Sequence, residues 1–190
     1  MLLVDPKMLD IPEEFESERL IIRAPRVRDA AQMIAAIEES LEELRPWMPW
    51  ATGVPTLHEA KDNLRKARRK HLARKDFRLQ FFLKGTDTLV GCGGMHRVDW
   101  SVPKVEIGYW ARTPFAGQGY ITEAVNAITE FAVRHFGARR VEIRMDDRNE
   151  RSWRVAERCG FQLEGILCNE RRQLDGSVGD TRVYAKVFPG

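Results

Sequence analysis

A short loop at residues 114–120 carries the clearest chemical signal in this sequence. It reads Pro-Phe-Ala-Gly-Gln-Gly-Tyr and joins a predicted strand to a predicted helix. Gly117 and Gly119 allow unusual φ angles and a close approach of the backbone to a ligand. The helix that follows presents unpaired N–H groups and the positive end of its dipole. These features predict a site for a phosphate or pyrophosphate, although a tight turn would need the same glycines.

The loop does not match either of the common nucleotide-binding patterns. It lacks the Gly-Lys-Ser/Thr of a P-loop, and Thr122 stands where GxGxxG requires its third glycine. Metal chemistry is not indicated, because the histidines have no mutual ligand spacing. These histidines are His58, His71, His96 and His135.

The cysteines favour packing over chemistry. Cys92 lies in Gly-Cys-Gly-Gly without a spaced histidine and asparagine, so a buried strand position is favoured over a nucleophile. Cys92, Cys159 and Cys168 show no CxxC spacing. We therefore expect neither a disulfide framework nor structural zinc, and a reducing cytoplasm fits best.

The elements that must position the loop alternate between strands and helices. Period-2 patterns and turn residues predict strands at 19–24, 77–84, 89–98, 104–112, 140–145, 161–174 and 178–187. Helical spacing of apolar residues predicts helices at 28–44, 57–73, 120–136 and 152–159. This order, β-α-α-β-β-β-α-β-α-β-β, predicts an α/β fold with helices packed on a mixed sheet.

Length and composition exclude several classes of protein. With 190 residues, 43% hydrophobic and 31% charged, the chain is expected to form one domain over 1–190. No apolar run approaches the ~20 residues that span a membrane, and the N-terminus lacks the pattern of a signal peptide. A net charge of +3 is too small to indicate a nucleic-acid-binding protein.

That charge is unevenly distributed along the chain. Residues 1–60 hold 12 acidic residues against 6 Lys/Arg, whereas residues 61–78 hold 9 Lys/Arg against 2 acidic residues. A solvated helix face is the favoured interpretation of the basic segment. The alternative is a surface that meets an acidic partner or a phosphorylated ligand.

Further segments place the glycine-rich loop in a family pattern. Glu106–Trp110, followed by GQGYITEA at 117–124, resembles the coenzyme-A loop of the GNAT acyltransferase superfamily. Asn149–Ser152, Cys159–Phe161 and Glu164-Gly165 resemble its next motif. ERLIIR at 18–23 and LRPWMPW at 44–50 are similar to a narrower branch, the ribosomal-protein N-terminal acetyltransferases of the RimJ/RimL type. The resemblance covers about residues 16–188.

The resemblance implies acetyl-CoA as the donor and the GNAT fold as its scaffold. That fold has a mixed, mostly antiparallel sheet, splayed between two strands (here 104–112 and 140–145), with helices on both faces. Main-chain groups of Trp110, Ala111 and Arg112 would pair with the pantetheine arm. The pyrophosphate would lie on backbone N–H groups of Gly117, Gln118, Gly119, Tyr120, Ile121 and Thr122. Ala116 and Ile121 depart from the superfamily pattern Gln/Arg-x-x-Gly-x-Gly/Ala.

Acetyl transfer to an amine needs a neutral amine and a proton acceptor. An α-amine, with a pKa near ~8, is far more available at neutral pH than a lysine amine near ~10.4. A carboxylate can therefore act as the base through a water molecule. The resemblance gives this role to Glu106, with Glu170 as the second choice. A plain surface glutamate is the alternative for each.

The leaving thiolate needs a proton donor. Ser152 matches the family serine proposed for this step, and Asn149 would orient the coenzyme. Either could instead cap a helix N-terminus. Tyr120 and Tyr109 are other hydroxyl donors, although Tyr109 is more typical of a core. Three tryptophans could wall the acceptor mouth or anchor an irregular segment: Trp47, Trp50 and Trp100.

The resemblance therefore implies an N-acetyltransferase that acts by direct attack in a ternary complex. The expected partners are acetyl-CoA and a protein or peptide N-terminus, without metal, membrane or nucleic acid, and a homodimer stays open. Two alternatives are kept. One is acetylation of a small amine (a polyamine, an amino acid or an antibiotic), and the other is a non-catalytic acyl-CoA-binding module.

Overall fold

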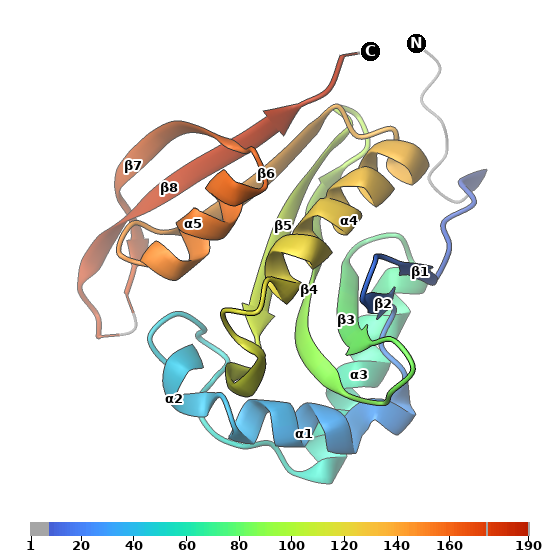
Figure 1. The fold of residues 1–190 in the computed structure, drawn as a ribbon. Helices are drawn as coiled ribbons and strands as arrows, with labels where there is room; N and C mark the ends of the chain where they lie inside the picture. Colours follow the sequence, from blue (N-terminus) through green and yellow to red (C-terminus); the bar gives the residue numbers. More distant parts are fainter. Residues whose placement is uncertain (1–7, 174, 190) are drawn as a thin grey trace.

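The computed structural model describes residues 8–173 and 175–189 (Figure 1). Its strands form one sheet in the order β1-β2-β3-β4-β5-β6-β8-β7. The strands are β1 (Glu14–Glu16), β2 (Leu20–Arg23), β3 (Phe77–Leu83), β4 (Leu89–Asp99), β5 (Lys104–Ala111), β6 (Arg140–Asp146), β7 (Gln162–Arg172) and β8 (Val178–Val187). Neighbouring strands are antiparallel except for the parallel pair β5–β6. The predicted mixed, mostly antiparallel sheet is confirmed.

Helices cover both faces of this sheet, as predicted (Figure 1). The helices are α1 (Ala30–Glu38), α2 (Leu41–Leu44), α3 (Leu57–Leu72), α4 (Tyr120–Phe136) and α5 (Glu150–Arg158). On one face, α4 and α5 pack on strand residues such as Ile107. On the other face, α1 and α3 enclose Cys92 and contact Trp110. Alternate residues of β4 and β5 therefore point toward two separate layers.

One predicted helix is divided in the structure. The continuous helix expected over 28–44 is wrong: a 3₁₀ turn at Val27–Asp29 leads into α1, and α2 follows a break at Ser40. Ser40 is fully buried, and its hydroxyl accepts a hydrogen bond from the N–H of Thr113 at 2.9 Å. Glu39 binds Arg112 beside it. Ser40 and Glu39 thus connect the end of α1 to the segment that follows β5. The spacing of apolar residues in the sequence does not predict such a tertiary contact.

The sheet opens between its two central strands. β5 and β6 pair only from Lys104 to Glu106, against Arg140 to Glu142. Beyond Glu106 and Glu142 the two strands continue to Ala111 and Asp146 without pairing to each other. The predicted splay is confirmed, and the pair Glu106–Glu142 lies at its vertex.

Two smaller findings complete the fold. The short strand β1, which pairs with β2, was not predicted from the sequence. Among the helices of residues 8–173 and 175–189, none is long and apolar enough to cross a membrane.

Candidate active site

The glycine-rich loop has the geometry that the sequence predicts. Gly117 and Gly119 have φ angles of +76° and +83°, which side-chain-bearing residues rarely adopt. Gly119 is the N-cap of α4, and the hydrogen-bond ladder begins with Glu123 N–H donating to Gly119 O at 3.0 Å. The preceding N–H groups, of Tyr120, Ile121 and Thr122, have no carbonyl within the helix. The loop therefore presents a row of amide donors suited to a phosphate.

Two arginines from distant segments flank this helix end. The Arg19 guanidinium donates to Gln118 O at 3.2 Å and lies over the Tyr120 ring at 4.4 Å. Arg158 Nε lies 3.4 Å from the Thr122 hydroxyl. Both side chains were missed as site residues, because neither lies near the loop in sequence. The only signal for Arg19 was its place in the ERLIIR segment.

Glu123 holds Arg19 in place. Its carboxylate accepts from Ser17 Oγ and from both the backbone and the guanidinium of Arg19, each at 2.7 Å. Burial acts to raise the pKa of Glu123, but these hydrogen bonds outweigh it and leave the pKa below its ordinary value. An ionised Glu123 therefore fixes Arg19 beside the amide donors at the start of α4.

Main-chain groups of β5 face the opening beyond the vertex. Arg112 N–H donates to Val90 O at 2.9 Å, so residue 112 bonds toward β4. By the alternation of an antiparallel ladder, Trp110 also bonds toward β4, whereas Tyr109 and Ala111 turn their N–H and C=O groups toward β6. Of the predicted residues 110–112, Ala111 therefore presents its main-chain groups to the opening, as does Tyr109, whereas those of Trp110 and Arg112 pair with β4.

Ile121 departs from the family pattern without entering the opening. Its Cδ1 lies 3.0 Å from the point where a Cβ on Gly91 would stand. The isoleucine thus packs onto β4, in space left by a glycine. Its backbone N–H stays available at the helix end.

Ser152, Asn149 and Tyr109 meet on the α4–α5 face of the opening. Asn149 caps α5 by accepting from Ser152 N–H at 3.1 Å, so Asn149 has the capping role and Ser152 does not. The Ser152 hydroxyl lies 3.3 Å from Tyr109 Oη, which itself donates to Ser152 O at 2.8 Å. Burial raises the pKa of Tyr109, which keeps its phenol protonated. Two coupled hydroxyl groups thus join β5 to α5 across the opening.

Carboxylates gather on the opposite face, at the vertex. Glu106 and Glu142 are register partners, so their side chains share this face. Arg97 Nη1 donates to Glu106 Oε2 at 3.1 Å, and Arg140 binds Glu142. Within the described residues, Glu106 Oε1 has no hydrogen-bond partner. Glu142 was missed by the sequence reasoning, because register is a property of the folded sheet.

Glu170 differs from Glu106 in that both of its oxygens are engaged. Oε1 accepts from Arg144 and Oε2 accepts from Thr181 Oγ1, each at 2.7 Å. Of the two candidate bases, Glu106 therefore keeps an open oxygen at the vertex.

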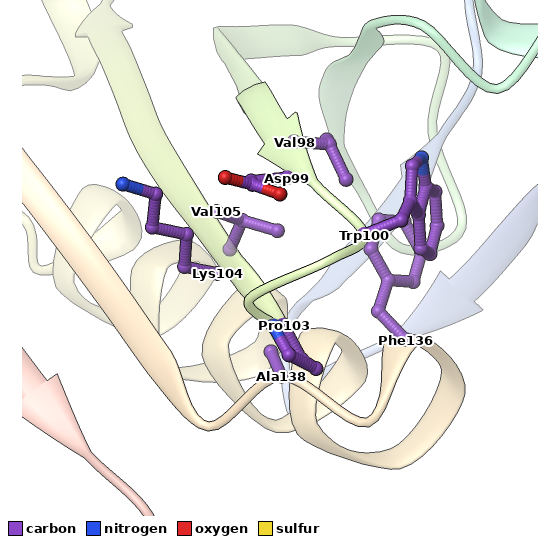
Figure 2. Close-up of a pocket in the computed structure, with 8 residues that line it drawn as sticks. All are labelled: Val98, Asp99, Trp100, Pro103, Lys104, Val105, Phe136 and Ala138. Carbon is purple, nitrogen blue, oxygen red and sulfur yellow. The ribbon is translucent and has the colours of Figure 1, made fainter. Parts of the chain in front are cut away.

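Two of the three candidate tryptophans, Trp50 and Trp100, lie at opposite ends of β5. Trp50, which is 47% exposed, packs against Trp110 with ring centroids 5.9 Å apart, on the face of α1 and α3. Trp100 instead packs on Phe77 and Phe136. It lines a depression at the start of β5 (Figure 2), away from the open end of the strands. Trp50 thus lies beside Trp110 near the open end of β5, whereas Trp100 lies at the other end of the strand.

Other sequence candidates take structural places. Among the described residues there is no group of three or more His, Cys, Asp or Glu side chains that could hold a metal. Burial raises the pKa of Cys92 to about 12, which leaves its thiol protonated at neutral pH. Along basic α3, Arg65 pairs with Asp62 and Arg68 pairs with Glu13, so part of the positive charge is neutralised within the chain.

Comparisons with known proteins agree with this geometry. Residues 19–162 match the family model of the acetyltransferase (GNAT) domain. The ribosomal-protein-serine acetyltransferase of Escherichia coli (strain K12) is 25% identical over 172 residues, which cover 86% of this chain and 96% of the relative.

Solved structures share the fold. RimL, a ribosomal L7/L12 α-N-protein acetyltransferase in complex with coenzyme A, superposes with a TM-score of 0.83. It is 22% identical, over 94% of this chain and 97% of that one. The microcin C7 self-immunity acetyltransferase MccE, in complex with acetyl-CoA and AMP, gives a TM-score of 0.82 at 24% identity, over 90% of this chain and 93% of that one.

Proposed function

Because the chain belongs to the acetyltransferase (GNAT) family and is an acetyl-CoA-dependent N-acetyltransferase, we propose that its acceptor is the N-terminal α-amine of a protein or peptide. The E. coli relative bears the name of a ribosomal-protein-serine acetyltransferase, which supports this acceptor class. The observation that carries the proposal is the opening between β5 and β6, with amide donors on one side and carboxylates on the other.

Residues on the two faces of the sheet have different roles in the proposed reaction. The N–H groups that follow Gly119, with Arg19 beside them, bind the pyrophosphate of acetyl-CoA. Backbone groups of Tyr109 and Ala111 bind the pantetheine arm, which brings the thioester to the vertex. The acceptor amine enters from the α1–α3 face, where Glu106 Oε1 receives its proton through a water molecule. The cap bond uses Asn149 Oδ1, and its side-chain N–H₂ group, which has no partner among the described residues, donates to the coenzyme.

A thiol-release assay with acetyl-CoA tests this function. The acceptor panel contains peptides with a free N-terminus, the same peptides blocked at the N-terminus but carrying an internal lysine, and small amines (a polyamine, an amino acid and an aminoglycoside). We expect thiol release and α-N-acetylation, read by mass spectrometry, only with the free N-termini, because about half of their amines are neutral near pH ~8, a far larger fraction than for lysine. Thiol release with a small amine and with none of the peptides would contradict this acceptor class and would assign a small amine as the acceptor.

The same samples separate an enzyme from a binding module. Acetyl-CoA should raise the Tm, as any ligand of the native state does. A Tm shift without thiol release from any acceptor would favour a non-catalytic acyl-CoA-binding module. The absence of both effects would contradict the coenzyme assignment.

Replacing Ser152 with Ala is expected to lower kcat by about tenfold to 100-fold, because the thiolate loses its proton donor. Tyr109→Phe should have a similar effect, and the double variant should be no slower than the slower single variant, since the two hydroxyls act as one unit. Steady-state kinetics with saturating acetyl-CoA measures this. A Tm equal to that of the wild type for Ser152→Ala excludes loss of a helix cap, a role that belongs to Asn149.

The proposal also covers the cellular compartment and the domain organisation of the enzyme. We place it in the cytoplasm as one catalytic domain over residues 1–190. The free thiols of Cys92, Cys159 and Cys168 support a reducing compartment.

A further inference from the structure

A histidine–aspartate pair lies on the same face of the sheet as Glu106. His96 Nδ1 is 2.7 Å from Asp76 Oδ2, and both side chains are partly exposed, 34% and 26% respectively. Burial acts to raise the pKa of Asp76, but the hydrogen bond with His96 and nearby cations outweigh it and leave the pKa below its ordinary value. An ionised Asp76 can only accept, so Nδ1 of His96 carries the shared proton. Nε2 is then the imidazole nitrogen that can take up another proton.

The register of the sheet brings this imidazole to the vertex. His96 is the cross-strand partner of Glu106, so the two side chains are neighbours on one face. The ring also lies over Gly108, where an added Cβ would stand 3.3 Å from its Cδ2 and 3.4 Å from its Nε2. Gly108 is the second residue beyond the last β5–β6 pair. The absence of a side chain there gives His96 its place beside the opening.

A distortion of β4 completes the cluster. The pairing register shifts directly after His96, and Arg97 has a φ of +47°. In a regular strand Arg97 would point to the opposite face from His96. The irregularity turns it back, so that it binds Glu106. The other ionisable groups around the pair are Lys70 and His71 of α3 and Arg78 of β3.

We propose that His96, oriented by Asp76, is the last group of the protein to receive the proton of the acceptor amine before it passes to solvent. The amine nitrogen attacks the thioester carbonyl carbon, and the C–S bond breaks. The amine proton passes through Glu106 and water to Nε2 of His96 and then to solvent. The Ser152–Tyr109 hydroxyls supply a proton to the thiolate and regain one from solvent, so that one proton leaves the amine and one reaches the thiol. His96 thereby returns Glu106 to its ionised form for each turnover. This role rests on the proposed acetyltransferase function.

The test compares His96→Gln with the wild type across pH, using the best acceptor of the panel. We expect kcat to fall by about 100-fold with the Kd for acetyl-CoA unchanged. The limb of the wild-type pH–rate profile that reports the proton acceptor should disappear in this variant. Asp76→Asn should lower kcat by about tenfold or more, because an amide can stabilise the other tautomer.

Two further measurements keep the proposal testable if His96→Gln is poorly folded. Added imidazole should restore part of the activity of His96→Ala, and no rescue together with a normal Tm would overturn the proposal. His58→Gln is the matched control, because it removes another His–Asp pair, at the start of α3, where the His58 side chain is exposed. A wild-type rate and an intact pH limb in His96→Gln would also overturn the proposal while leaving the acetyltransferase function in place. Inactive wild-type protein would instead contradict the function itself.

Discussion

Replacing Glu106 with Gln is expected to lower kcat by about 100-fold or more while leaving the Kd for acetyl-CoA unchanged. The carboxylate lies at the vertex of the opening, with Oε2 held by Arg97 and Oε1 without a partner among the described residues. An amide keeps the size of the side chain but cannot take up the amine proton. The groups proposed to bind the coenzyme lie on α4 and on the β6-facing edge of β5, so the substitution leaves them intact. Thiol-release kinetics gives kcat, and calorimetry gives the Kd.

A matched control separates catalysis from the loss of an ion pair. Glu14→Gln removes another arginine-paired glutamate, on β1 and away from the vertex. Because partly exposed ion pairs contribute only about 0–1 kcal/mol, both variants should unfold close to the wild-type temperature. A Glu106→Gln enzyme with wild-type kcat would remove Glu106 from the role of base. Glu142, its register partner, would then be the next carboxylate to replace.

Features encoded in consecutive residues were predictable from the sequence. The loop at 114–120 needs glycine at two positive-φ positions, and both glycines have that geometry. The order of strands and helices followed from periodicity, because most elements bury one regular face. Helix α5, predicted over 152–159, begins at Glu150, since Asn149 provides the cap one turn before Ser152.

Features that depend on cross-strand register were not predictable in the same way. Glu142 enters the site only because β6 pairs with β5 in one particular register. The same holds for His96, which is brought to Glu106 by an antiparallel pairing across ten residues of sequence. The spacing of the histidines along the chain did not indicate a metal site. It also gave no information on Asp76, the hydrogen-bond partner of His96. Arg19 and the break at Ser40 likewise arise from contacts with distant segments.

Replacing Asp29 with Asn is expected to cause the largest loss of stability of the substitutions considered, about 3–5 kcal/mol. Arg23 and Asp29 are only 7% and 5% exposed, and they form a bidentate pair with N–O distances of 2.7 and 2.9 Å. The Arg23 guanidinium also lies over the Phe82 ring at 4.1 Å. Without the carboxylate, a buried guanidinium keeps its charge and loses its counter-ion. For a chain of this length the loss corresponds to roughly 10 °C in Tm, which calorimetry measures.

The Arg23–Asp29 pair has this effect because it connects two parts of the fold. Each of the two buried side chains also neutralises the charge of the other. Arg23 ends β2, and Asp29 lies in the 3₁₀ turn that leads into α1, so the pair sets the start of the helix whose other end contacts Arg112. Asp62→Asn is the control: it removes a partly exposed aspartate that pairs with Arg65 and His58 on α3, and it should cost less than about 1 kcal/mol. Replacing both charges, as in Arg23→Met with Asp29→Leu, should recover much of the lost stability, since no uncompensated buried charge remains. If Asp29→Asn and Asp62→Asn unfold at the same temperature, the buried pair does not hold α1 on the sheet.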